Sequence, residues 1–185
     1  MVSHEFGHCF AKLADEYVVY EDRVPDWMLE AYFSGEYVII TKLGIFRNID
    51  FTSDPSKIKW SAFLTDSRYA DTDTGIFEGG FLYRYGVWRP SAESIMTSWG
   101  DHFNAPSREA IYNRIHKLAY GYDWVFDFES FVDYDMKNIE AEKASQSSSP
   151  AKPNKIESIH RRRPSMDIKL STNKNGEKTL TIIMD

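Results

Sequence analysis

Residues 3–17 read SHEFGHCFAKLADEY, and this stretch decides what the chain can be. It contains the pattern H-E-x-x-H, formed by His4, Glu5 and His8. On an α-helix, side chains four residues apart lie on the same face, about one 5.4 Å turn apart. Two imidazoles so placed bind one Zn²⁺, and the glutamate after the first histidine acts as general base toward a water at the metal's open position. The motif predicts a helix over about residues 2–13 and a hydrolytic zinc site.

A catalytic zinc takes three protein ligands, so the motif needs a third one. The favoured candidate is Asp15, eleven residues after His4, and Glu16 beside it is an alternative. In a continuous helix Asp15 would lie about 10 Å along the axis from His8, so its participation requires the helix to end near residue 11 or 12. The usual residue for such an ending is a left-handed glycine, and residues 8–34 contain none.

A second arrangement is also open, in which a glutamate from the next helix completes the site. Residues 25–33, PDWMLEAYF, predict a short helix because Pro25 suits a first helical position. Glu30 in this helix lies at a suitable separation from the motif. A zinc site of that kind normally has a carboxylate three residues later to orient a histidine, whereas this chain has Phe33. We therefore favour Asp15 over both Glu30 and Glu16.

At residues 4–17 the sequence resembles the bacterial zinc metallopeptidases grouped with the IgA-cleaving peptidases, a metzincin-like family. The similarity covers about residues 3–135 and continues in further blocks. These are RNID at 47–50, KW at 59–60, GIFEGG at 75–80, WRP at 88–90, SIM at 94–96 and FNAPSREAI at 103–111. One H-E-x-x-H pattern alone is weak evidence, but these blocks in this order are specific.

The resemblance implies an α+β, metzincin-like zinc peptidase catalytic domain with Zn²⁺ as its cofactor. The implied zinc ligands are His4, His8 and Asp15, with Glu5 as general base. The resemblance also implies a methionine-bearing turn beneath the metal, which would contain Met96. One departure is Lys12, because this family is expected to have glycine or another small residue in the turn after the helix.

The activity implied by the resemblance is that of a zinc-dependent endopeptidase acting on protein or glycoprotein substrates. The family is extracellular or attached to the cell surface, although this sequence shows no signal-peptide pattern. In metzincins a sheet precedes the motif helix, so we expect an N-terminally truncated member that lacks this sheet portion. The competing hypothesis is a catalytically inactive, truncated peptidase-like protein that binds proteins or glycans.

Residues 75–90 alternate aromatic residues with glycine and then turn toward a Trp-Arg-Pro sequence. Within this region Glu78 and Arg89 belong to the blocks that carry the resemblance. We expect both to hold the shape of the site rather than to take part in the chemistry. The aromatic residues of the segment YRYGVW at 83–88 either line a binding cleft or belong to the core and ordinary surface.

The rest of the first 142 residues gives simpler predictions. Residues 37–41, YVIIT, predict a strand, and residues 43–74 predict a long loop that would form a cleft wall in a peptidase. A helix is predicted after the cap Asn104, with Pro106 in its first turn and Gly121 at its end.

Two further predictions concern burial. Residues 123–135 interleave acidic with aromatic residues and are expected to form a half-buried cap on the domain. Cys9, beside a predicted ligand, is expected to be a small buried residue. It is the only cysteine, so an internal disulfide is excluded.

Composition divides the chain into three parts. Residues 1–142 form the predicted catalytic domain, residues 143–164 a flexible linker with a basic run, and residues 165–185 a β-hairpin or incomplete C-terminal module. Residues 143–185 hold nine Lys and Arg against four Asp and Glu, whereas the first 142 residues have a net charge of −11. One short basic run without aromatic residues does not predict nucleic-acid binding. No apolar run is long enough to span a membrane.

Overall fold

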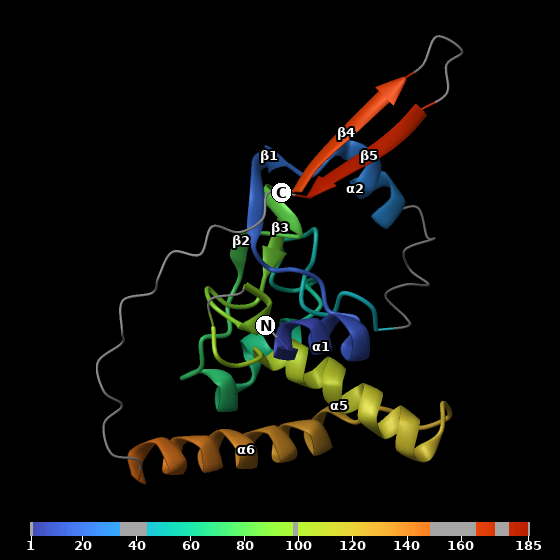
Figure 1. Ribbon diagram of the computed structural model, residues 1–185. Helices are drawn as coiled ribbons and strands as arrows, with labels where there is room; N and C mark the ends of the chain where they lie inside the picture. Colours follow the sequence, from blue (N-terminus) through green and yellow to red (C-terminus); the bar gives the residue numbers. More distant parts are fainter. Residues whose placement is uncertain (1, 34–43, 98–99, 149–165, 173–177, 185) are drawn as a thin grey trace. The chain divides into compact units, whose positions relative to one another are not determined.

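The structure, a computed structural model, describes residues 2–33, 44–97, 100–148, 166–172 and 178–184 (Figure 1). The chain falls into two compact units, Met1–Lys143 and Ala144–Asp185. The first unit combines helices with a small sheet, which confirms the predicted α+β class. The strand predicted at residues 37–41 lies outside the described residues. None of the helices in the described ranges has the length and apolar character that a membrane crossing requires.

The sheet of the first unit has three strands in the order β1-β3-β2. β1 (Val18–Arg23) runs parallel to β3 (Leu82–Arg89), and β2 (Phe77–Gly80) runs antiparallel to it. The register of both pairs shifts along the strands, and in the β2–β3 pair the shift lies between Glu78 and Gly80, where glycine replaces a side chain. Because β1 begins directly after the motif stretch, the sheet fixes the position of residues 15–17.

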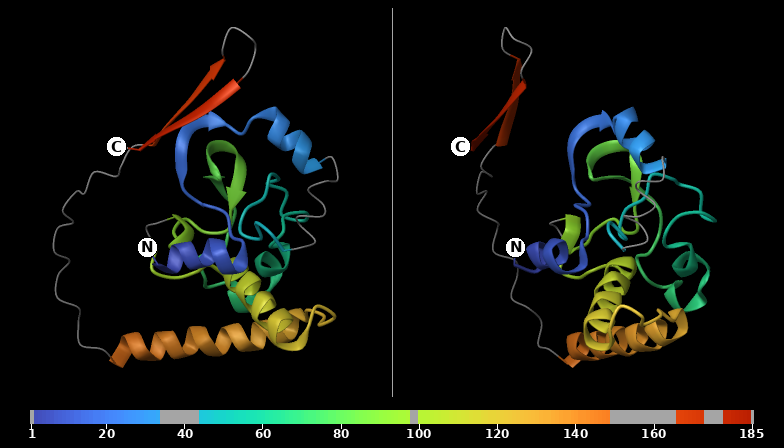
Figure 2. Two further views of the ribbon diagram at one scale, coloured as in Figure 1. Left: turned by 45° about the vertical axis from the view of Figure 1, so that its right-hand side comes forward. Right: turned by 90° about the vertical axis from the view of Figure 1, so that its right-hand side faces the viewer.

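Five α-helices and two short 3₁₀ helices are described. They are α1 (Val2–Ala11), α2 (Asp26–Phe33), α4 (Ser61–Thr65), η1 (Ser67–Tyr69), η2 (Ile95–Thr97), α5 (Ala105–Tyr120) and α6 (Phe128–Ser148). α1 packs against α5 and η2 (Figure 2). The motif helix is therefore held against the turn that contains Met96.

The helix predicted between Asn104 and Gly121 is confirmed as α5. The side chain of Asn104 accepts a hydrogen bond from the Ser107 amide at 3.2 Å, which satisfies one free amide of the first turn. Pro106 lies in that turn, where its missing N–H costs nothing. Gly121 ends the helix with a φ of +96°.

The segment predicted as a long loop at residues 43–74 is mostly irregular in its described part, 44–74, but it also contributes to the core. It contains α4 and η1, and its Trp60 and Phe63 belong to the largest hydrophobic cluster together with Phe131 of α6. Residues 58–69 therefore contribute to the core rather than to a cleft wall, whereas Phe46 of the same segment lines a hollow beside His8 and Asp15. The sequence does not predict this part of the core, because turn residues are frequent in the segment and its buried side chains follow neither helical nor strand periodicity.

The acidic and aromatic stretch at residues 123–135 is half-buried, as predicted. Phe131 and Val132 are buried, and so is Asp135, whose carboxylate accepts hydrogen bonds from Arg108 at 2.7 and 2.8 Å. The Tyr69 hydroxyl also donates to Asp135, at 2.9 Å. These contacts attach the first turns of α6 to α5 and η1.

The helix α6 continues to Ser148, so the first six residues of the predicted linker, 143–148, are helical. In the second unit, β4 (Met166–Thr172) and β5 (Lys178–Met184) form an antiparallel pair. Their register runs from Met166 opposite Met184 to Thr172 opposite Lys178. This pair lies where the sequence predicts a β-hairpin.

Candidate metal centre

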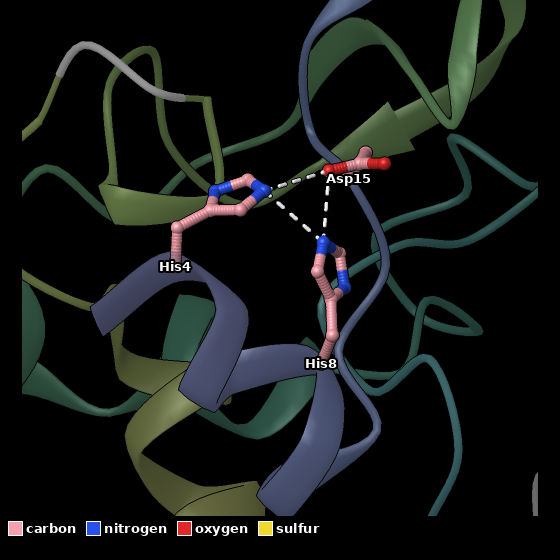
Figure 3. A group of neighbouring side chains, drawn as sticks. All are labelled: His4, His8 and Asp15. Carbon is pink, nitrogen blue, oxygen red and sulfur yellow. Dashed lines mark hydrogen bonds and ion pairs between the residues drawn. The ribbon is translucent and has the colours of Figure 1, made fainter. Parts of the chain in front are cut away.

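Three of the predicted site residues converge on one point (Figure 3). His4 and His8 project from the same face of α1, and Asp15 approaches from the segment before β1. The two Nε2 atoms are 3.1 Å apart, and Asp15 Oδ1 lies 3.0 Å from His4 Nε2 and 3.1 Å from His8 Nε2. Ligand atoms about 2.0–2.1 Å from a tetrahedral zinc lie about 3.3–3.4 Å from one another. The triangle therefore fits a metal ion with small adjustments.

The other ring nitrogen of each histidine is held by a backbone carbonyl. His4 Nδ1 lies 2.9 Å from the Ile95 oxygen, and His8 Nδ1 lies 2.7 Å from the Leu13 oxygen. Because a carbonyl oxygen only accepts, each Nδ1 carries the hydrogen, and each neutral ring presents the lone pair of its Nε2. In this neutral form, two lone pairs and a carboxylate oxygen within 3.1 Å repel one another unless a metal ion, or a proton on one Nε2, lies between them. The donor set thus suits a metal.

The position of Asp15 depends on where α1 ends. The helix ends at Ala11, two residues before the predicted end, and Lys12 has a φ of +56°. The amide of Leu13 then donates a hydrogen bond to the Gly7 oxygen at 3.2 Å, so the chain changes direction directly after the last turn of α1. Lys12 therefore occupies the left-handed position for which a glycine was expected, and this turn carries Asp15 to the histidines.

We expect Lys12→Gly to raise the free energy of unfolding by about 0.5–1 kcal/mol. A non-glycine residue in the left-handed region costs about 1–2 kcal/mol, from which the extra backbone entropy of glycine in the unfolded chain must be subtracted. The matched control is Lys12→Ala, which keeps the strain and loses the 3.0 Å hydrogen bond from Lys12 Nζ to the Cys9 oxygen. Urea unfolding of the three proteins measures the effect. A glycine variant less stable than the alanine variant would contradict it.

Met96 lies in the core below α1, in the short helix η2. Its side chain is fully buried in a cluster with Ala11, Leu13 and Ala110. A Cβ atom on Gly7 would be only 2.7 Å from Met96 Sδ, so this close approach requires glycine in the middle of the motif helix. The turn containing Met96 thus lies directly against the helix that presents the two histidines.

Glu16, an alternative third ligand in the sequence, faces the interior instead. It is 1% exposed, and its Oε1 accepts hydrogen bonds from Asn48 Nδ2 at 2.7 Å and Asn104 Nδ2 at 2.9 Å. Its Oε2 accepts from Ser94 Oγ at 2.6 Å, and its amide donates to the Met96 oxygen at 2.9 Å. Burial raises the pKa of the Glu16 carboxyl, and the hydrogen bonds from Ser94, Asn104 and Asn48 oppose that rise. Glu16 ties the Asp15 segment to η2.

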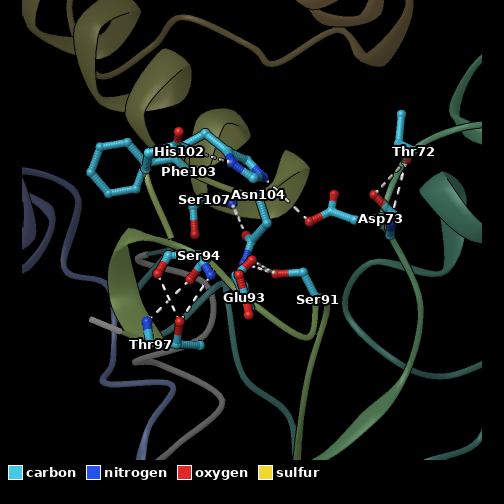
Figure 4. A network of polar contacts seen from close by, with 12 residues as sticks. Thr72, Asp73, Ser91, Glu93, Ser94, Thr97, His102, Phe103, Asn104 and Ser107 are labelled. Carbon is cyan, nitrogen blue, oxygen red and sulfur yellow. Dashed lines mark hydrogen bonds and ion pairs between the residues drawn. The ribbon is translucent and has the colours of Figure 1, made fainter. Parts of the chain in front are cut away.

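The residues around Glu16 are themselves connected (Figure 4). Ser94 Oγ also accepts the Met96 amide at 3.0 Å, and Thr97 Oγ1 donates to the Ser94 oxygen at 2.8 Å. Asn104, besides capping α5, donates to Ser91 Oγ at 3.1 Å. One buried polar network therefore joins the segment after the motif, the turn at Met96 and the start of α5.

The other predicted site residues lie outside the converging group. Glu5 follows His4 on α1 and is exposed, and Glu30 is exposed on α2. Glu78 accepts a hydrogen bond from the Gly86 amide at 3.1 Å. Arg89 Nη1 donates to the oxygens of Glu78 and Gly79 at 2.9 and 2.6 Å. These last contacts stay within β2 and β3.

Phe81 and Leu82, at the junction of β2 and β3, nevertheless contact the segment of the candidate metal centre through the backbone. The Phe81 amide donates to the Asp15 oxygen at 2.8 Å, and the Leu82 amide donates to the Tyr17 oxygen at 3.1 Å. Arg89 therefore holds Gly79 in β2, two residues before Phe81, whose amide contacts Asp15. Glu78 and Arg89 thus contact the backbone of β2 and β3, and their role in holding the shape of the site stays a prediction.

Several contacting residues were not singled out as site residues in the sequence. The carbonyl of Ile95 and the side chains of Asn48 and Ser94 all support the centre, and the ring of Tyr17 stacks near His4 with centroids 6.2 Å apart. Their only signal is membership in the blocks RNID, SIM and LADEY.

The prediction that Cys9 is buried is wrong, because this residue lies on the exposed side of α1.

His102 links the loop after η2 to residue 73. Its Nε2 lies 3.3 Å from Asp73 Oδ2 and its Nδ1 lies 3.0 Å from Asp101 Oδ1. The hydrogen bond with Asp73, followed by that with Asp101, raises the pKa of His102 to about 9 against the effect of burial. The same contact with His102 lowers the pKa of Asp73. The backbone oxygen of His102 accepts the Ile95 amide at 2.8 Å, close to the contact with His4.

The stabilisation from His102 should depend on pH. It is fully present below about pH 6.5, the ordinary pKa of an unfolded histidine, and is lost as the pH rises through about 9. The contribution of Asp73 is present above about pH 3.9 and is lost on further acidification, since its folded pKa is lowered. The His102 side chain is 44% exposed, so we expect an effect of at most about 1 kcal/mol.

The measurement compares wild type with His102→Asn by urea unfolding at pH 6 and pH 10. The difference between the two proteins should be larger at pH 6 than at pH 10 by at most about 1 kcal/mol, because the charge of His102 contributes only at the lower pH. Because other groups titrate equally in both proteins, their contribution cancels. A difference that is the same at both pH values would show that the charge of His102 does not contribute.

Comparisons with known proteins do not assign this chain to a family. No family model matches the chain, and a search of curated proteins gives no significant match. Within the described ranges, His4, His8 and Asp15 are the one group of three or more His, Cys, Asp or Glu side chains whose ligand atoms converge closely enough for a metal.

Proposed function

We propose that this chain is a metzincin-like, zinc-dependent endopeptidase domain. The observation that carries the proposal is the convergence of His4 Nε2, His8 Nε2 and Asp15 Oδ1 within 3.1 Å, with both Nδ1 atoms held by carbonyl oxygens. Further support comes from the order of features along the chain. The motif helix is followed by a sharp turn to a carboxylate, a buried methionine turn and a helix, as in the family that the sequence resembles.

In this proposal the residues have separate roles. His4, His8 and Asp15 would hold the metal, which would supply a Lewis acid and lower the pKa of coordinated water toward about 7. Glu5, next to the first ligand, takes the proton of the attacking water and passes it to the leaving amine. The packing of Met96 and the hydrogen bonds of Glu16 hold the motif helix and the Asp15 segment in fixed positions relative to each other. The substrates are proteins or glycoproteins outside the cell or at its surface.

The test begins with the metal content of the purified chain. Two histidines and one carboxylate also suit Fe(II), so zinc and iron are both quantified by elemental analysis. The zinc-loaded chain is then incubated with casein and with IgA, with and without a chelator. One zinc per chain and cleavage that the chelator abolishes would support the proposal. One zinc per chain without cleavage would favour the inactive binding protein instead.

The assignment of Asp15 as third ligand gives a further expected result. Asp15→Ala should weaken zinc binding by more than the roughly 10–100-fold caused by losing a group that only hydrogen-bonds a ligand. The matched control is Asp22→Ala, which removes an exposed aspartate from β1. Competition with a zinc-binding dye measures both affinities. Equal zinc affinity in the two variants would exclude Asp15 as a ligand.

A further inference from the structure

A group of aromatic rings lies where α5 ends and α6 begins (Figure 2). The centroid of the His116 ring is 3.8 Å from that of Tyr112 and 4.9 Å from that of Trp124. Tyr120 adjoins His116 at 5.7 Å, and Tyr134 of α6 adjoins Tyr112 at 5.3 Å. Together these five residues form the α5–α6 ring cluster. None of them belongs to the candidate metal centre or to the hollow beside it.

The inner rings of the cluster pack on the core, whereas the outer rings face solvent. Tyr112 is buried in the largest hydrophobic cluster, and Trp124 packs against that cluster. Tyr120 is 72% exposed and Tyr134 is 53% exposed. Tyrosine offers a large contact area at a low cost in conformational entropy, and tyrosine and tryptophan are enriched where proteins bind partners. The cluster is therefore an exposed aromatic surface on a rigid support.

The segment that carries most of this cluster is strongly acidic. Residues 118–136 contain five Asp and Glu and no Lys or Arg. Two of the five pair with arginines, at 2.7 Å for Asp135 with Arg108 and at 2.9 Å for Glu129 with Arg68. The other three are exposed and form no ion pair within the described ranges; they are Asp123, Asp127 and Asp133. Their negative charge is therefore not balanced by a partner in this part of the fold.

One of these three carboxylates, Asp127, lies beside the cluster. Burial raises the pKa of the Tyr112 hydroxyl, and the charge of Asp127 raises it further, followed by Tyr120 and Tyr134. The phenol groups of the three tyrosines thus lie within electrostatic reach of one another and of Asp127. Asp127 Oδ1 also accepts the Ser130 amide at 2.8 Å, which holds this carboxylate at the start of α6.

The electrostatics of this surface selects a cation. The face of an aromatic ring is negative and attracts a Lys or Arg head group within about 6 Å of the ring centroid. Among the described residues, the one cation–π contact is Lys59 over Tyr32, so no described cation of the chain lies over these rings. Lys117 and Lys137, which flank the segment in sequence, form no ion pair in the described structure. An anionic partner would be repelled by Asp127, whereas a cationic one would gain ring contacts and ion pairs.

We propose that the α5–α6 ring cluster and its neighbouring carboxylates bind a basic segment of a protein partner, with an Arg or Lys side chain against the rings of Tyr120 and Tyr134 and near Asp127. Arginine suits the surface best, because its planar group both stacks on rings and pairs with carboxylates. Such binding needs neither a metal nor hydrolysis. The inference therefore does not depend on the proposed peptidase function.

The first experiment is an NMR titration of the isotope-labelled full chain with three capped peptides, Gly-Arg-Leu-Arg-Gly and its counterparts with Gln or Glu in place of Arg. We expect the arginine peptide to shift amides of residues 112–136 and to bind about 3–30-fold more tightly than the glutamine peptide. The glutamate peptide should bind most weakly, and about 0.5 M salt should weaken the arginine peptide. Equal affinity of the arginine and glutamine peptides, or shifts confined to other residues, would overturn the inference.

The contribution of the carboxylate is tested with Asp127→Asn. This variant removes the charge and keeps a side-chain oxygen for the Ser130 amide, so α6 keeps its cap. Affinity for the arginine peptide should fall about 1.5–5-fold, and affinity for the glutamine peptide should stay the same. The matched control is Asp22→Asn, which removes the charge of an exposed aspartate in β1. Equal effects of the two variants would contradict a role of Asp127.

The contribution of the rings is tested with the double variant Tyr120→Leu and Tyr134→Leu, which keeps apolar side chains at both positions. Losing two ring contacts should weaken the arginine peptide about 5–30-fold. The control is Tyr85→Leu, because Tyr85 lies on β3 outside the cluster and is 46% exposed. Unchanged affinity in the double variant would show that the rings do not hold the cation and would overturn the inference.

A glycan is the other class of ligand that exposed aromatic rings bind, because sugar rings also stack on them. Cellohexaose is therefore titrated under the same conditions as the peptides. We expect it to leave the amides of residues 112–136 unchanged. Shifts of these amides with cellohexaose but not with the arginine peptide would replace the basic partner by a glycan and overturn the inference.

Discussion

Replacing Glu5 with glutamine is expected to reduce peptide hydrolysis by about 10²–10⁴-fold while zinc stays bound. Glutamine has nearly the same shape but cannot take a proton from the attacking water. Glu5 is exposed on α1 and lies outside the converging group of His4, His8 and Asp15, so its substitution removes no metal ligand. The expected loss is in kcat rather than in KM, since proton transfer belongs to the transition state.

The measurement combines kcat and KM on a casein-derived peptide with the zinc content of each preparation. Glu30→Gln is the matched control, because Glu30 is also an exposed glutamate on a helix and was an alternative ligand in the sequence. It should change neither zinc content nor turnover. Full activity of Glu5→Gln would refute its role as general base, and loss of zinc would mean that Glu5 acts on the metal itself.

The second large effect is expected at Glu16, although its side chain points away from the metal centre. Glu16→Ala should lower the free energy of unfolding by about 3–5 kcal/mol, because it leaves a cavity and removes the acceptor for Asn48, Ser94 and Asn104. Zinc affinity should fall as well. The reason is that Glu16 helps to hold the adjacent Asp15 against η2.

A milder variant keeps this prediction testable if the alanine variant does not fold. Glu16→Gln preserves the volume but replaces one acceptor oxygen with a donor, so it should cost about 1–3 kcal/mol. Urea unfolding and zinc competition are measured on both variants. Glu21→Ala, which removes an exposed glutamate from β1, is the control and should stay within about 0.5 kcal/mol of wild type. Unchanged stability in Glu16→Gln would show that the buried carboxylate is not required.

Local sequence was sufficient for the elements with strong local signals. His4 and His8 lie in the helix α1 that their spacing predicts, and α5 begins and ends at its predicted caps Asn104 and Gly121. Helix spacing alone also places His4 and His8 on one face, because side chains four residues apart are neighbours. These features depend on contacts within one or two helical turns, which a sequence displays directly.

The choice between Asp15 and Glu16 required the tertiary structure. Successive side chains of an extended segment point to opposite sides, so one of the two carboxylates must face away from the histidines. The partners that hold Glu16 in the interior, Asn48, Ser94 and Asn104, are 32, 78 and 88 residues away in the chain. No local pattern reveals such distant hydrogen bonds.

The end of α1 was likewise only partly predictable from the sequence. The sequence determined that a carboxylate ligand at residue 15 requires a break near residue 11 or 12, but it offered no glycine there. The structure makes Lys12 left-handed, with the turn held by Phe46 and by the core packing of Leu13 against Met96. Tertiary contacts outweigh a local conformational preference of about 1–2 kcal/mol, because several buried groups act on one residue.

The stretch SHEFGHCFAKLADEY by itself determined the ligand types, their helical spacing and the candidate base. Only the tertiary structure decided which carboxylate completes the triangle and that an apolar hollow adjoins it. The physical reason is that histidine spacing is a property of one helix. The hollow joins Tyr20, Phe46 and Phe81 from separate segments, whose packing and hydrogen bonds exist only in the folded chain.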